Sequence, residues 1–86
     1  MATRRGISKT LKSAEHAEFC TLMIETRRKA GLTQHQLARK LRKPQSFVAK
    51  YEGGERRIDV IEFVSIARAL KVDVLVLLRA LINRLP

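Results

Sequence analysis

Residues 32–63 read LTQHQLARKLRKPQSFVAKYEGGERRIDVIEF, and this stretch decides the fold. Thr33 is a favourable N-cap for a helix over 33–41, whose apolar residues form one short stripe. Pro44 disfavours helical geometry at the residue before it but fits the first turn of a new helix. The pattern therefore predicts two short helices, 33–41 and 44–52, joined by a tight turn.

The second of these helices has two different faces. Val48, Tyr51 and Glu52 fall on one side of the helix, and a mostly polar set falls on the other. The outward set is Gln45, Ser46, Ala49 and Lys50. Gly53-Gly54 ends the helix, because glycine accepts the left-handed conformation of a helix C-terminus without steric cost. One face is thus expected to pack and the other to contact a partner.

Three further helices are expected around this pair, over 13–30, 59–70 and 73–85. Their N-caps are Ser13, Asp59 and Asp73. The last helix carries too many apolar residues for one narrow stripe, so it is expected to have two partners. No strand-like alternation or repeat is present in the sequence. We therefore expect an all-α fold, a compact five-helix bundle that contains a helix-turn-helix.

The charge balance points to a polyanionic partner. The 86 residues hold 18 Lys and Arg against 8 Asp and Glu, a net charge of +10. Ten of the basic residues lie between Arg27 and Arg57, where the only acids are Glu52 and Glu55. A chain of this length makes one domain, which we place at 13–86.

A basic arm is expected over residues 1–12, which show no sustained apolar period. Its cations are Arg4, Arg5, Lys9 and Lys12. If the polyanionic partner is DNA, these cations either follow its backbone or enter a minor groove. Otherwise the arm is simply an unattached terminus.

The stretch 32–63 resembles the phage-repressor and Cro-type helix-turn-helix family, also called Xre-like regulators, and the likeness extends from about Phe19 to Leu78. The residues that carry it are Gln34, Leu37, Ala38, Leu41, Val48, Tyr51 and Glu52 followed by glycine. The resemblance implies base contacts from the outward residues of helix 44–52, with phosphates held by Gln34 and by the amides near Gly54. It also implies a largely buried ion pair between Arg27 and Glu52.

The chemistry of the outward residues agrees with this resemblance. Gln45 can pair bidentately with adenine, Lys50 can donate to guanine, Ser46 suits either base, and the Ala49 methyl can touch a thymine methyl. Lys43, Arg56 and Arg57 are placed to neutralise backbone phosphates.

One residue departs from the family pattern, because Arg42 stands in the turn where glycine is usual. A left-handed arginine is mildly strained. Either the turn is altered, or Arg42 keeps the strain and contacts a phosphate.

Other side chains are expected to have structural roles. His16, Cys20 and His35 do not make the usual four-ligand zinc site, so no metal or other cofactor is expected. Cys20 is expected to be half-buried and His35 to face solvent, and Phe47 is expected to pack on its neighbours. The sequence contains no nucleophile–base pair, acidic dyad or phosphate-binding glycine loop, so we do not expect an enzyme.

The last helix, within residues 72–86, is the expected dimerisation element. Its candidate interface residues are Leu77, Leu78, Leu81, Ile82 and Leu85. These residues either complete a small core or form a partner surface, and we favour a symmetric homodimer.

Together these features predict a sequence-specific DNA-binding transcriptional regulator, expected to be a repressor. Helix 44–52 would enter the major groove of double-stranded DNA at a palindromic operator. The alternative is an antitoxin or other interaction module that binds a toxin or another protein as well as DNA. The lone cysteine and the lack of an apolar signal or membrane span favour a cytoplasmic, nucleoid-associated protein.

Overall fold

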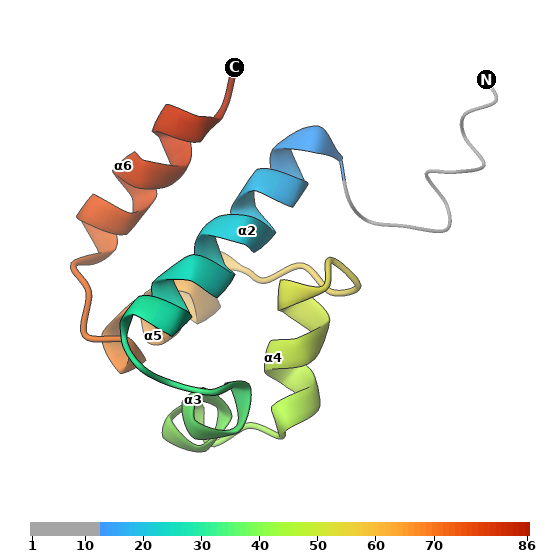
Figure 1. Cartoon of the computed structure of the whole chain (residues 1–86), viewed down its shortest axis with the longest axis vertical. Helices are drawn as coiled ribbons and strands as arrows, with labels where there is room; N and C mark the ends of the chain where they lie inside the picture. The colour runs from blue at the N-terminus through green and yellow to red at the C-terminus, as the bar shows by residue number, and fades with distance from the viewer. Residues whose placement is uncertain (1–12) are drawn as a thin grey trace, which may run out of the picture.

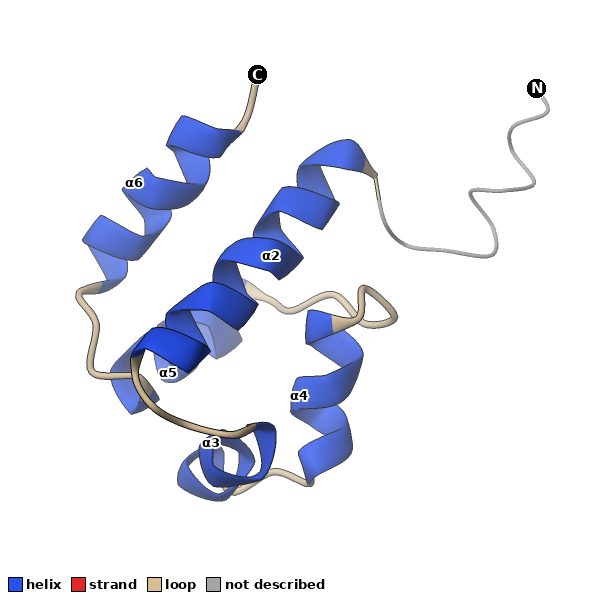
Figure 2. Ribbon diagram, in the orientation of Figure 1, coloured by secondary structure: helices blue, strands red, loops and turns tan. Residues whose placement is uncertain are grey.

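The computed structural model describes residues 13–86, which form five helices and no strand (Figures 1 and 2). The helices are α2 (Ala14–Lys29), α3 (Gln34–Leu41), α4 (Gln45–Glu52), α5 (Val60–Ala69) and α6 (Val74–Arg84). The all-α prediction and the order of the helices are confirmed. The expected basic arm lies outside the described residues. None of the described helices combines the length and the apolar character needed to cross a membrane.

Four of these helices have an N-cap side chain that accepts a hydrogen bond from a first-turn amide, at the residues expected from the sequence. The capping residues are Ser13, Thr33, Asp59 and Asp73. At α3 and α5 the side chains of Gln36 and Glu62 bond back to the cap N–H, which completes two capping boxes. These local bonds satisfy amides that would otherwise lack a partner at each helix start. They explain why the helix starts could be predicted.

Four helices end through a residue with left-handed backbone. Two of these residues are Gly31 and Gly54, and the other two are Arg42 (φ 58°) and Lys71 (φ 60°). Arg42 therefore keeps the usual turn geometry and accepts the strain, whereas the left-handed conformation of Lys71 was not predicted. A left-handed residue with a Cβ costs roughly 1–2 kcal/mol relative to the right-handed form.

The hydrophobic core receives side chains from all five helices. Its largest fully buried members are Tyr51, Met23, Leu37, Ile66 and Val48. Figure 1 shows α6 lying beside α2, and α6 also packs on α5. Leu77 is buried in this core with 4% of its surface exposed, so its assignment to a dimer interface is wrong. Leu81 and Leu85 are half-buried, and Cys20 is buried rather than half-buried.

A buried ion pair connects α2 to the end of α4. Arg27 Nε donates to Glu52 Oε2 at 2.8 Å and Nη2 donates to Oε1 at 3.1 Å. The side chains are only 10% and 3% exposed. Arg27 Nη1 also donates to the carbonyl of Leu32 at 2.9 Å, in the connection to α3. The guanidinium therefore holds three segments of the chain together.

Truncation of one partner should be strongly destabilising. We expect Glu52→Ala to lower the free energy of unfolding by about 3–5 kcal/mol, because it leaves the Arg27 charge buried without its partner. Urea denaturation followed by circular dichroism measures this. Glu55→Ala is the matched control at an exposed site and should change the value by less than about 0.5 kcal/mol. Equal stability of the two variants would show that the buried pair does not constrain the fold.

Candidate nucleic-acid interface

The outward face of α4 is polar and accessible, as the sequence predicts. Ser46 and Lys50 are exposed, and Gln45 and Ala49 are half-buried. The opposite face is closed, because Val48, Tyr51 and Glu52 are buried. The four outward residues thus occupy one side of a short helix at the edge of the molecule (Figure 1). An α-helix with such a face fits the major groove of B-DNA.

A chain of hydrogen bonds joins Gln45, the first residue of α4, to the buried ion pair. Gln45 Nε2 donates to Gln34 Oε1 at 2.7 Å, and Gln34 Nε2 donates to Glu52 Oε1 at 2.8 Å. We refer to Gln45, Gln34, Glu52 and Arg27 as the polar relay. The Gln45 amide is therefore fixed in orientation. Its oxygen and one N–H remain available, which is the acceptor and donor pair that adenine requires.

The relay changes what Gln34 is expected to do. Its side chain was expected to hold a phosphate, but both ends of the amide are engaged within the protein. The backbone remains suitable, since Gln34 and His35 are the first two residues of α3 and Thr33 caps the third amide instead. N–H groups at a helix start attract phosphate. His35 is exposed, as expected.

Arg56, which was predicted to neutralise phosphate, is paired with a carboxylate of the protein itself. Its Nη1 and Nη2 donate to the two carboxylate oxygens of Glu62 at 3.0 and 2.9 Å. Hydrogen bonding to Arg56 and to the Asp59 amide lowers the pKa of Glu62, and the bond to Glu62 raises the pKa of Arg56. The pair fixes the α4–α5 loop against the first turn of α5.

Phe47 packs on its neighbours, as expected from its position on the shoulder of α4. Its ring meets Tyr51 edge-on with centroids 5.4 Å apart. The guanidinium of Arg56 lies 4.8 Å from the Phe47 centroid, and the Lys43 ammonium lies 5.4 Å from it. Burial and the neighbouring Glu52 raise the pKa of Tyr51 well above its usual value, so this hydroxyl stays protonated.

Two other groups that were predicted to contact phosphates, the Gly54 amide and the Arg57 side chain, are directed towards partners within the protein. Gly54 is buried, and its N–H donates to the Tyr51 carbonyl at 3.3 Å, so the amide is not presented to a phosphate. Arg57 is exposed, but its Nη1 lies 3.3 Å from His16 Nδ1 at the start of α2. The Arg57 guanidinium is thus directed towards α2.

The cations of the helix-turn-helix are largely uncompensated. Arg39, Lys40, Lys43 and Lys50 are exposed, and the ion pairs found in residues 13–86 include none of them. Uncompensated cations beside a polar helix face favour a polyanion. Within the same residues, no group of three or more His, Cys, Asp or Glu side chains is arranged to hold a metal ion.

The comparisons with known proteins agree with this geometry. A helix-turn-helix family model matches residues 23–77, more than half of the chain. The structure is similar to that of an XRE-family like protein from Pseudomonas syringae pv. tomato str. DC3000, with a TM-score of 0.78, 38% identity and 100% of both chains covered. Comparison with curated protein sequences gives no match.

Restriction-modification controller proteins share the fold. C.AhdI from Aeromonas hydrophila is 28% identical, with a TM-score of 0.69 over 74% of this chain and 93% of that one. C.Esp1396I, whose structure is a tetramer in complex with its natural 35 base-pair operator, is 22% identical, with a TM-score of 0.76 over 84% and 95% of the two chains. The family match and the Pseudomonas relative show that the chain belongs to the helix-turn-helix family, as an XRE-like DNA-binding transcription regulator.

Proposed function

We propose that the protein is a repressor that binds a palindromic operator as a two-fold dimer, with α4 in the major groove. The observation that carries this proposal is the polar relay, which fixes the Gln45 amide at the start of an otherwise accessible polar helix face. A preoriented side chain loses less conformational entropy when it pairs with a base. The structural neighbour C.Esp1396I, in complex with its own operator, supports DNA as the partner.

Each outward residue of α4 has a specific chemical role in the proposed complex. Gln45 pairs with adenine, Lys50 donates to guanine, and Ser46 and the Ala49 methyl contact the neighbouring bases. Lys43 and the amide of Gln34 contact backbone phosphates, which add affinity without sequence information. A dimer that occupies a promoter through these contacts represses by excluding the polymerase.

The dimer surface in this proposal is the outer face of α6. Leu75, Leu78 and Ile82 follow helical spacing and are exposed, in contrast to the buried Leu77. Beside them, Val60, Phe63 and Leu81 line an apolar groove of about 260 Å³. Exposed apolar area of this kind marks a partner surface. A two-fold dimer through α6 would present two copies of α4 to half-sites about 34 Å apart.

The DNA-binding proposal is tested by selection from a randomised duplex pool at physiological salt, followed by sequencing of the bound DNA. The protein should enrich an inverted repeat. Gln45→Ala/Lys50→Ala should lose that enrichment, because each bidentate base contact contributes about 1–3 kcal/mol of discrimination.

A matched control removes the same chemical groups elsewhere. Lys29→Ala/Asn83→Ala deletes one ammonium and one amide from exposed positions outside α4, and should retain the enriched motif. Salt-sensitive retention of all sequences alike by the wild-type protein would contradict the proposal. Enrichment that survives in the α4 double variant would place the base contacts on another element.

The dimer proposal is tested by sedimentation equilibrium. Ile82→Asp places a charge on the proposed interface and should convert the dimer to a monomer that remains folded by circular dichroism. Ile61→Asp is the matched control, because Ile61 is the same residue type and is also exposed but lies on another face of the molecule. A wild-type monomer at all concentrations, or a dimer that Ile82→Asp leaves intact, would rule out this interface.

A further inference from the structure

A second groove lies on the opposite side of α5 from the proposed dimer surface. It has a volume of about 240 Å³ and runs between α5, the end of α3 and the shoulder of α4. Its apolar walls are Leu41, Phe47, Ile61 and Ile66. Ile61 is 74% exposed, as is its neighbour Val60, but the two side chains line different grooves. Apart from Lys43, which the proposed complex places on a phosphate, the proposed DNA and dimer contacts leave the lining of this groove uncovered.

The rim of the groove is cationic. Lys43 lines it, Arg42 is adjacent at the end of α3, and Arg68 continues the Ile61–Ser65 stripe along α5. The one acid in the lining, Glu62, is already committed to Arg56. The ion pairs within residues 13–86 do not involve Arg42, Lys43 or Arg68.

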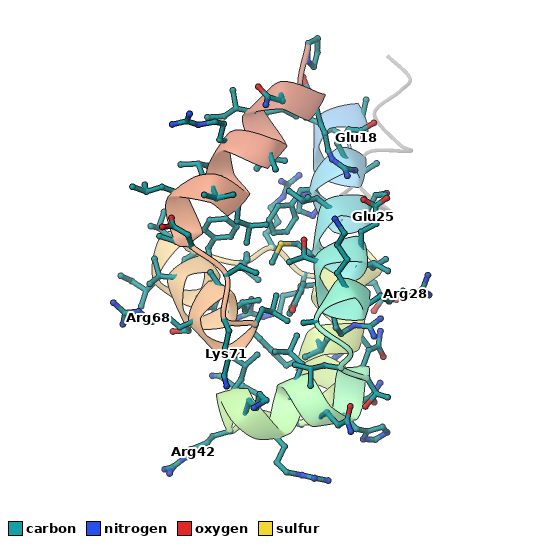
Figure 3. All side chains as sticks on the ribbon, turned by 60° about the vertical axis from the view of Figure 1, so that its left-hand side comes forward. Glu18, Glu25, Arg28, Arg42, Arg68 and Lys71 are labelled. Atoms are coloured by element: carbon teal, nitrogen blue, oxygen red, sulfur yellow. The ribbon has the colours of Figure 1, made fainter. Side chains whose placement is uncertain are left out.

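Figure 3 shows how these cations are distributed. Arg42, Arg68 and Lys71 lie on one side of the molecule, along α3 and the end of α5, and Arg28 points out on the other side. Two of the gathered residues, Arg42 and Lys71, occupy left-handed backbone where glycine stands at the two equivalent helix ends. The chain thus accepts backbone strain at two positions that contribute cations to this side of the molecule. We therefore assign Arg42 to the groove and not to the operator phosphates.

We propose that this groove binds an acidic amphipathic segment of a partner protein. An apolar side chain of the segment lies against Ile61, and its carboxylates pair with Arg42 and Arg68. A protein segment is favoured over a second DNA duplex because the duplex backbone presents mainly charged phosphate and little apolar surface to cover the exposed isoleucine, whereas protein interfaces combine an apolar centre with a charged rim. The proposal is independent of the DNA contacts of α4.

The test uses defined probes with the full chain. The first probe is a fluorescein-labelled helical peptide of about 15 residues, with leucine on one face and glutamate elsewhere. The second probe replaces each leucine by alanine, and the third is a DNA duplex. Binding is measured by fluorescence anisotropy and located by NMR shifts of the ¹⁵N-labelled protein.

The leucine peptide should shift amides of residues 41, 42 and 61–68, and the duplex should shift those of α4 and Lys43. Ile61→Ser and Arg68→Glu should each weaken peptide binding about tenfold or more. Ile61→Ser should leave duplex affinity unchanged within about twofold. Val60→Ser is the control for lost apolar exposure, and Arg28→Glu, also in the last turn of its helix, is the control for charge reversal.

Three outcomes would overturn the proposal. Equal binding of the alanine peptide would show attraction by charge alone, with no use of the apolar walls. Peptide-induced shifts confined to α4 would show that the peptide only imitates DNA. Shifts of residues 61–68 caused by the duplex, or by self-association of the protein without peptide, would assign the groove to DNA or to a second copy of the chain.

Discussion

The buried ion pair between Arg27 and Glu52 is the constraint on which the rest of the structure depends. A buried guanidinium and carboxylate are tolerated only when their hydrogen-bonding groups are satisfied. Here Arg27 uses the carboxylate of Glu52 and the carbonyl of Leu32, and Glu52 also accepts from Gln34. The pair fixes the position of α4 against α2 and α3. Through Gln34 it also fixes Gln45, so one interaction connects the fold to the proposed base contact.

The surface of the molecule divides into three regions with different chemistry. The α4 face is polar and lies among uncompensated cations, which suits DNA. The outer face of α6 is apolar, which suits a second copy of the chain. The groove beside Ile61 is apolar with a cationic rim, which suits an acidic segment. Helix α5 separates the last two regions, because Val60 and Ile61 are adjacent in sequence but line different grooves. A protein partner and DNA could therefore bind to the same molecule.

The sequence was sufficient for the helices and for the outward face of α4, because caps such as Thr33 and periodic apolar residues act locally. It could not decide among contacts made across the fold. The apolar pattern of the last helix placed Leu77 among its interface candidates, but the pattern could not show that the core of the same chain buries this side chain. The sequence showed Arg56 to be a cation in a basic loop. It did not show that Glu62, six residues further along the chain, is its hydrogen-bonding partner. The antitoxin alternative stays a hypothesis from the sequence.

The polar relay is another example of contacts across the fold that the sequence could not predict. Gln34 and Gln45 were both expected to contact DNA, but their mutual hydrogen bond depends on how α3 and α4 cross. The left-handed conformation of Lys71 was missed because lysine gives no local signal for it, whereas Gly54 does. Local chemistry therefore predicted the elements, and packing between elements decided which polar groups remained available to a partner.

A double-mutant cycle between Gln34 and Gln45 in duplex binding tests the central claim most directly. The duplex is one enriched by the wild-type protein, and urea denaturation establishes that every variant is folded. If the relay positions the base contact, Gln34→Ala should weaken binding in the wild-type background and have little effect in the Gln45→Ala background, a coupling of about 1 kcal/mol. Equal losses in the two backgrounds would contradict the account, because Gln34 would then act independently of Gln45.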